Sequence, residues 1–166
     1  RAIGEGKGET LFYLTAKTIT GTVAQEAFHI LREKGLKFKV TAITAKEKLC
    51  FQDTPECTPE KCPYAKGHFD RVNDAVYELW TTEEVYSREV IRAHAEKWQV
   101  CPFEMCLDLS IWVDGIICDY NYVFDPNVHL KRFFGENISG DYIFLIDEAH
   151  NLVERGREMY SAGISR

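Results

Sequence analysis

The segment YIFLIDEAH at residues 142–150 contains four consecutive apolar residues that are directly followed by two acids. The apolar run Ile143–Ile146 predicts a strand buried on both faces, as in parallel sheets that are covered by helices. In open α/β sheets, ligands bind at the carboxyl ends of the strands. We therefore predict an α/β fold whose sheet presents Asp147 and Glu148 to a ligand.

Adjacent carboxylates at such a strand end do separate jobs in nucleotide hydrolases. One can hold Mg²⁺, directly or through water, and the other can polarise the attacking water. His150, three residues beyond Asp147, can pass the state of the phosphate site to neighbouring elements. The alternative is that the acids only place favourable negative charge at a helix N-terminus. The complete D-E-A-H pattern after an apolar strand favours the nucleotide site.

A phosphate-binding loop of the pattern G-x-x-x-x-G-K-[ST] does not occur in this sequence. The segment GEGKGET at Gly4–Thr10 contains glycines and a lysine but lacks the spacing. From the order of the elements we expect the loop just before Arg1. The chain is therefore expected to be an excerpt that does not hydrolyse nucleotide by itself.

The first 45 residues have the pattern of a strand–helix–strand unit. Leu11–Ala16 and Phe38–Thr44 predict strands, and Thr22–Lys34 predicts a helix that ends at Gly35. Such a unit implies a parallel sheet. The apolar residues of the helix fall on one stripe, namely Val23, Ala27, Ile30 and Leu31.

A mostly helical insert is predicted to interrupt this α/β layer. A loop at Cys50–Pro63 precedes two helices at residues 68–80 and 83–98, with a capping signal at Thr81-Thr82 and Glu84 between them. Pro102 opens a third helix, over residues 101–112. Strands then return at residues 114–124 and 141–150. The predicted segments are 1–45 and 112–166 for the α/β layer and 46–111 for the insert.

Composition limits the class of protein. The chain has 166 residues, of which 45% are hydrophobic, enough to bury the core of one domain with an insert. No apolar run approaches the roughly 20 residues of a membrane span, and the first residues do not resemble a secretory signal. A cytoplasmic protein is expected. The net charge of −6 argues against a general polyanion binder but leaves room for a local basic groove.

Four of the six cysteines predict a metal site. Cys50, Cys57 and Cys62 lie in one loop with the spacing C-x6-C-x4-C, and Cys101 stands directly before the proline that opens a helix. Without an export signal, thiols are more often metal ligands or buried residues than disulfides. The residues leave zinc and iron–sulfur both open, although the lack of a C-x-x-C pair lowers the odds of a zinc ribbon. Cys106 and Cys118 are predicted to be packed in the core.

Six motifs in this order give the chain its resemblance to a known family. LTAKTITGT, KEKLC, KCPYAKGHFDRVNDAVY, VCPFEMCLDLS, ICDYNYVFDP and LIDEAHN occur in the same order as in the XPD/DinG-type iron–sulfur DNA helicases, and the sequence is most similar to the bacterial DinG-related branch. The resemblance implies a superfamily-two motor that uses ATP to move 5′ to 3′ on single-stranded DNA. It also implies a partial RecA-like parallel sheet with a mostly helical 4Fe–4S insert before the DEAH box.

The resemblance also assigns residues. Asp147 and Glu148 would be the magnesium and water-activating pair, with His150 in the same motif. The partners would be single-stranded DNA and fork or overhang junctions. The motor would be monomeric and would not bind a membrane. The cluster would be held by Cys50, Cys57, Cys62 and Cys101, with Cys106 as the rival of Cys57. The DNA backbone would be contacted by Thr15, Lys17 and Thr18.

Two other classes of function stay open on the residues alone. The chain could be a non-catalytic DNA-binding or redox-sensing module held together by a metal, or a structural zinc domain. Thr18 could simply cap a helix. Aromatic side chains that could stack on bases, but that are more often core, are Tyr64, Phe69, Tyr120 and Tyr122. A basic surface or phosphate path near the cysteine loop would comprise Lys46, Lys48, Lys61, Lys66, His68 and Arg71.

Overall fold

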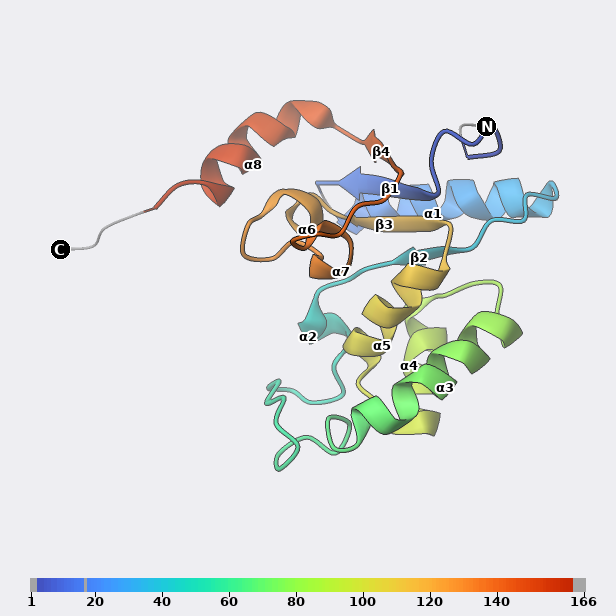
Figure 1. The fold of residues 1–166 in the computed structure, drawn as a ribbon, viewed down its shortest axis with the longest axis vertical. Helices are drawn as coiled ribbons and strands as arrows, with labels where there is room; N and C mark the ends of the chain where they lie inside the picture. The colour runs from blue at the N-terminus through green and yellow to red at the C-terminus, as the bar shows by residue number, and fades with distance from the viewer. Residues whose placement is uncertain (1–2, 17, 163–166) are drawn as a thin grey trace. The chain divides into compact units, whose positions relative to one another are not determined.

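The computed structural model describes residues 3–16 and 18–162, without the side chains of residues 18–21. The chain divides into two compact units. Unit 1 comprises residues 1–36 and 115–166, and unit 2 comprises residues 37–114. Figure 1 follows the chain through both units, each of which is described by itself below.

Unit 1 is built on three parallel strands. They are β1 (Thr10–Thr15), β3 (Gly115–Asp119) and β4 (Tyr142–Ile146), with β1 in the centre. Helix α1 (Thr18–Glu33) packs against β1 and β3. Because all three strands run in the same direction, their carboxyl ends lie at one edge. The predicted parallel α/β sheet is confirmed.

The core of unit 1 is an aromatic cluster around the central strand. Phe12 is fully buried, and the rings of Phe133, Phe134, Tyr142 and Phe144 have centroids within 5.2–5.5 Å of its own. Helix α7 (Lys131–Phe134) supplies two of these rings, and β4 supplies the other two. Edge-to-face and offset contacts of this kind add to the stability that comes from burial.

The prediction that β4 is buried on both faces is wrong, and the apolar stripe of α1 is exposed. The strand β4 is not buried on both faces, since Phe144, Leu145 and Ile146 are 37–47% exposed. Among the described strands of unit 1 it pairs with β1 alone and forms the edge of that sheet. On α1 the predicted apolar stripe is exposed, including Val23, whereas Ala24 is buried. The helix packs through the neighbouring face, where a small residue allows close approach.

The connection after β3 differs from the prediction because a side chain ends the strand. The apolar pattern predicted a strand over residues 114–124, but the strand stops at Asp119. The Asp119 carboxylate accepts a hydrogen bond from the N–H of Asn121 at 2.9 Å and starts the short helix α6 (Asn121–Phe124). Beyond β4 the chain forms a 3₁₀ turn, η2 (Ala149–Asn151), and helix α8 (Leu152–Met159).

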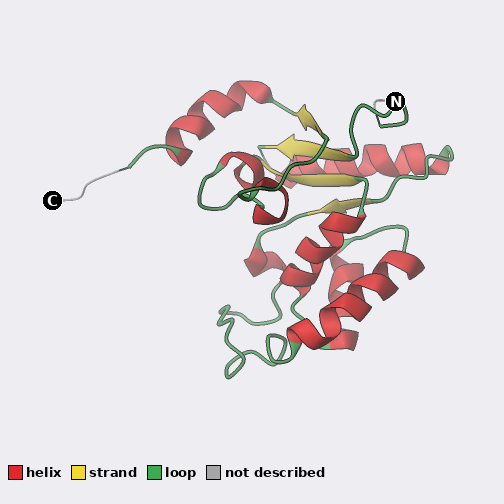
Figure 2. Cartoon of the chain, in the orientation of Figure 1, coloured by secondary structure: helices red, strands yellow, loops and turns green. Residues whose placement is uncertain are grey.

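Unit 2 is mostly helical, as predicted for the insert. It contains the strand β2 (Val40–Ala42) and the helices α2 (Lys46–Leu49), α3 (His68–Thr82), α4 (Arg88–Trp98) and α5 (Pro102–Leu109), with a 3₁₀ turn, η1, at Ser110–Trp112. Helices α3, α4 and α5 pack on one another around fully buried side chains such as Leu79, Ile91 and Met105. Figure 2 shows the long loop between α2 and α3, which carries three cysteines.

None of the helices in the described residues is both long enough and apolar enough to cross a membrane.

The start of α4 lies five residues later than predicted, because the cap is a different residue. Ser87 accepts a hydrogen bond from the N–H of Val90 at 3.2 Å and begins the helix at Arg88. The hydroxyls of Thr81 and Thr82, expected to cap it, instead donate to carbonyl oxygens of α3. Serine and threonine are both good cap residues, so the residue type alone does not show which hydroxyl accepts the hydrogen bond from the first turn of the helix.

Replacing Ser87 by alanine is expected to weaken the first turn of α4. Loss of a serine cap costs about 1 kcal/mol, which corresponds to roughly fivefold faster opening of that turn. Amide hydrogen exchange of residues 88–91 measures this, with Thr82→Ala as the matched control that removes a hydroxyl from the end of α3. Equal exchange in the two variants would show that Ser87 is not the cap.

Candidate functional sites

The four cysteines predicted to bind a metal line a single cavity in unit 2. The cavity has a volume of about 370 Å³. Cys50 ends α2, Cys57 and Cys62 lie in the loop before α3, and Cys101 directly precedes α5. Three separate stretches of chain therefore contribute a cysteine to the lining of the same cavity, and the prediction that these cysteines bind a metal stays a prediction.

Backbone hydrogen bonds fix the chain around these sulfurs. The N–H of Cys62 donates to the carbonyl oxygen of Thr58 at 2.8 Å, and the N–H of Gln52 donates to Cys50 Sγ at 3.4 Å. The N–H of Cys101 donates to His68 Nδ1 at 3.2 Å. His68, at the start of α3, therefore holds the backbone of Cys101 in place, a role that the sequence did not indicate.

The electrostatics around Cys101 combine burial with nearby donors. Burial raises the pKa of the Cys101 thiol, while the backbone N–H groups of Glu104 and Phe103, at the start of α5, oppose that rise. Lys46 lies beside the thiols, and its hydrogen bond with the Cys57 side chain raises the pKa of the ammonium group. The ammonium also sits 5.6 Å from the centroid of the Phe103 ring. These donors and the cation offset only part of the effect of burial, so the pKa of the Cys101 thiol is raised overall.

The other two cysteines lie elsewhere. Cys106, the predicted rival of Cys57, is fully buried 3.9 Å from the hydroxyl of Thr41 and does not line the cavity. Burial raises the pKa of the Cys106 thiol to about 11. Cys118 is buried in β3, and burial raises the pKa of its thiol as well. Both are packed core residues, as expected.

Within the described ranges, no group of three or more His, Cys, Asp or Glu side chains is arranged to hold a metal ion. Two thiolates on one zinc ion would lie within about 4.6 Å of each other, because each Zn–S bond is about 2.3 Å long. The cysteine side chains are placed around a cavity instead.

The second site is the carboxyl edge of the sheet in unit 1. The N–H of Asp147 donates to the carbonyl oxygen of Leu14 at 2.9 Å, which continues the pairing of β4 with β1 past the end of the strand. Thr15 and Asp119 are register partners at the same edge. Asp147 also faces Tyr13, and the pKa of that phenol is raised by burial and, to a smaller extent, by the Asp147 carboxylate.

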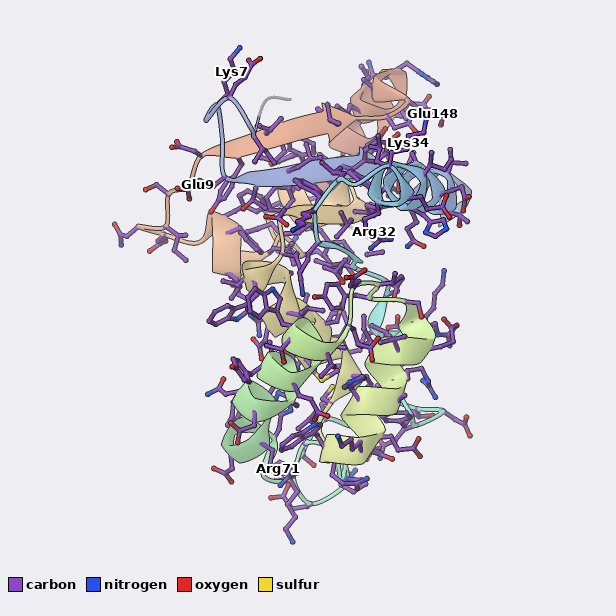
Figure 3. The ribbon with its side chains drawn as sticks, turned by 90° about the vertical axis from the view of Figure 1, so that its right-hand side faces the viewer. Lys7, Glu9, Arg32, Lys34, Arg71 and Glu148 are labelled. Atoms are coloured by element: carbon purple, nitrogen blue, oxygen red, sulfur yellow. The ribbon has the colours of Figure 1, made fainter. Side chains whose placement is uncertain are left out.

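The acid pair is presented by a tight turn. Glu148 has a φ of 47°, a left-handed conformation, and its N–H donates to Asp147 Oδ1 at 2.9 Å. Asn151 Nδ2 donates to Glu148 Oε2 at 3.1 Å and orients that carboxylate. Glu148 and His150 are exposed, and Figure 3 shows Glu148 beyond the tip of β4. The structure thus places Asp147, which is half-buried, and the exposed Glu148 and His150 in one turn at the carboxyl edge.

The predicted DNA-contact residues begin at the same edge. Thr15 is buried at the end of β1. Lys17 lies outside the described residues, and Thr18 is the first residue of α1, with its side chain also outside them. The acid pair, which directly follows β4, therefore lies at the same end of the sheet as Thr15 of the LTAKT motif, the last residue of β1.

Several basic residues near the cysteine loop have local partners. Arg71, which is labelled in Figure 3, donates to the carbonyl oxygens of Trp98, Gln99 and Lys66 and ties α3 to the end of α4. Lys61 pairs with Glu56 at 2.6 Å. Arg71 and Lys61, two of the basic residues of the predicted phosphate path, thus already have partners within unit 2.

Comparison with known proteins identifies the fold and then the family. A solved structure described as truncated XPD matches 87% of this chain and 42% of its own length, with a TM-score of 0.57 and 18% identity. The fold is thus that of an XPD-like helicase domain. The DEAD_2 family model matches residues 26–166. The chain therefore belongs to the DEAD_2 family of XPD/DinG-type superfamily-two helicases.

Curated relatives agree with this assignment. The XPD/RAD3 helicase subunit of general transcription and DNA repair factor IIH from Saccharomyces cerevisiae is 32% identical over 114 residues, which are 69% of this chain and 14% of that protein. A Fanconi anemia group J protein homolog from Gallus gallus is 29% identical over 89 residues, 54% of this chain and 6% of that protein. The chain thus spans a small part of the length of these relatives.

Proposed function

We propose that this chain is part of the first motor domain of an ATP-dependent DNA helicase that moves 5′ to 3′ on single-stranded DNA. The observation that carries the proposal is the shared sheet edge, where Asp147 and Glu148 follow β4 and the LTAKT motif begins at the end of the neighbouring strand β1. Because β1 and β4 are hydrogen-bonded neighbours, a change at the nucleotide site after β4 can shift the DNA contact at the end of β1. The glycine–lysine loop that completes such a nucleotide site does not occur in this sequence and would belong to another part of the complete helicase.

In this proposal the two acids have different tasks. Asp147 would hold Mg²⁺, which neutralises charge that develops on the phosphates when it is bound. The carboxylate suits this task because it lies at the carboxyl edge of the sheet and is only partly buried. Glu148, oriented by Asn151, would polarise the attacking water.

The DNA contact would be independent of base sequence. Lys17 and Thr18 offer an ammonium group and a hydroxyl, which bind phosphates without reading bases, whereas the Thr15 side chain is buried at the end of β1. The partners would be single-stranded DNA and fork or overhang junctions.

The four cysteines that line the cavity in unit 2 would hold a 4Fe–4S cluster. Four thiolates, one for each iron, are the usual ligands of such a cluster. A cavity of about 370 Å³ with four thiols around it is larger than a single ion requires. When bound, the cluster would join the α2 end, the loop and the α5 start, and its role would be structural.

The complete helicase polypeptide that contains this chain tests the proposal. Its ATP hydrolysis should rise severalfold or more when single-stranded DNA is added, and it should unwind a duplex with a 5′ overhang. A duplex with only a 3′ overhang serves as the control for polarity. Hydrolysis that does not respond to DNA, or unwinding only from the 3′ overhang, would contradict the proposed activity.

Two cysteine variants separate the predicted ligand from its rival. In Cys57→Ala the cavity loses one thiol, so iron bound per chain should fall by more than half. In Cys106→Ala the cavity keeps its four thiols, so iron content should stay the same. Iron is measured on protein purified without oxygen. The reverse pattern would make Cys106 the ligand.

A further inference from the structure

Tyr120, the residue directly after β3, contacts the turn that carries the acid pair. Its side chain is fully buried. The hydroxyl donates to the carbonyl oxygen of Asp147 and lies 3.1 Å from that of Glu148. Tyr120 and the acid turn are 27 residues apart in sequence. The chemistry proposed above makes no use of this tyrosine.

The acid turn needs such a contact because its backbone is unfavourable. A left-handed φ of 47° at Glu148 is costly for a residue with a Cβ atom and persists only where the surroundings impose it. At the start of the turn, the carbonyl oxygen of Leu14 accepts a hydrogen bond from the N–H of Asp147. Within the turn, the carbonyl oxygens of Asp147 and Glu148 are contacted by the hydroxyl of Tyr120. The conformation that directs the Glu148 carboxylate is thus set between two neighbouring strands.

Tyr120 is itself held from both sides. Its N–H donates to the carbonyl oxygen of Thr15 at 3.3 Å. The flanking residues Asp119 and Asn121 accept hydrogen bonds from Arg155 Nη2 on α8, at 3.0 and 3.2 Å. Helix α8 directly follows the acid turn in sequence. The segment around Tyr120 is therefore bonded both to the turn, through the Tyr120 hydroxyl, and to the helix after it, through Arg155. The hydroxyl therefore has little freedom to move away from its acceptors.

We propose that Tyr120 is a positioning residue of the nucleotide site, whose hydroxyl fixes the Asp147–Glu148 peptide and thereby aims the Glu148 carboxylate at the attacking water. The proposal deepens the proposed function and rests on it for the identity of the reaction. Whether the hydroxyl holds the turn can be measured by amide exchange, which does not depend on enzymatic activity.

Tyr120→Phe in the complete helicase tests the proposal, because it removes the hydroxyl and keeps the ring. The DNA-stimulated kcat should fall about tenfold to a hundredfold, since small misplacements of a catalytic group have effects of this size. The KM for ATP and the affinity for single-stranded DNA should stay within about twofold. Amide exchange over residues 146–151 should become about tenfold faster.

Tyr160→Phe is the matched control. Its hydroxyl also donates to a backbone carbonyl oxygen, that of Phe124, at 2.9 Å, but at the exposed end of α8. This variant should leave kcat and the exchange of residues 146–151 unchanged. Binding of a non-hydrolysable ATP analogue counts the folded sites, so that kcat is expressed per folded molecule even if a variant folds poorly.

The outcomes separate this proposal from the proposed function. If the unmodified protein shows no DNA-stimulated hydrolysis, the proposed function fails, and amide exchange still decides whether Tyr120 holds the turn. If hydrolysis is present but Tyr120→Phe changes kcat and exchange no more than Tyr160→Phe does, the positioning role is refuted while the helicase assignment stands.

Discussion

Glu148→Gln in the complete helicase should lower DNA-stimulated ATP hydrolysis at least a hundredfold, because loss of a catalytic base costs about 10²–10⁴ in rate. Glutamine has nearly the same size as glutamate and can still accept the hydrogen bond from Asn151 Nδ2. It has no carboxylate with which to polarise water. Binding of ATP and of single-stranded DNA should therefore be preserved while the rate of hydrolysis collapses.

The matched control is Glu154→Gln, which makes the same chemical change at an exposed position in the first turn of α8. Its hydrolysis rate should equal that of the unmodified protein. Hydrolysis is measured as phosphate released per folded site, with and without single-stranded DNA. Retention of DNA-stimulated hydrolysis by Glu148→Gln would remove the basis for assigning this turn to the nucleotide site.

Cys62→Ser and Cys101→Ser should each abolish cluster binding and unfold the cysteine-lined part of unit 2. Thiolate–metal bonds supply on the order of 10 kcal/mol to small metal-dependent folds, which is comparable to the whole stability of a domain. Unwinding should be lost, whereas ATP binding, which depends on the sheet of unit 1, should largely survive. Iron content, amide exchange of α3–α5 and strand separation are the measurements.

Cys106→Ala serves again as the control, since it removes a buried thiol from the same unit without touching the cavity. It should keep its iron and its unwinding activity. Unwinding by Cys62→Ser or Cys101→Ser at the rate of the unmodified protein would show that the cavity is not a cluster site on which the motor depends.

Local patterns predicted the parallel sheet of unit 1 and the mostly helical insert, and they selected the residues of the two candidate sites. The apolar run before Asp147 predicted a strand. Because the run stops at Ile146, it also predicted that Asp147 follows the carboxyl end of that strand. Cysteines in a loop and before Pro102 predicted convergence, because such positions leave side chains free of regular packing. The parallel sheet followed from the order of strands and helices.

Features that depend on distant partners could not be predicted in this way. The apolar stripe of α1 does not indicate which face packs on the sheet, because Val23 and Ala24 are adjacent in sequence and only the sheet decides which of them is covered. The cap of α4 was misplaced because Thr81 and Ser87 are equally good cap residues until the helix start is known. Tyr120 gave no local signal, since its acceptors lie 27 and 28 residues further along the chain.

The proposed iron–sulfur cluster in the cavity lined by Cys50, Cys57, Cys62 and Cys101 can be observed directly. The most direct measurement is the visible absorption spectrum of protein purified without oxygen, together with its iron, sulfide and zinc content. The protein should be brown and should contain about four irons and as many sulfides per chain. Colourless protein that contains one zinc ion per chain and no iron would contradict the proposed cluster.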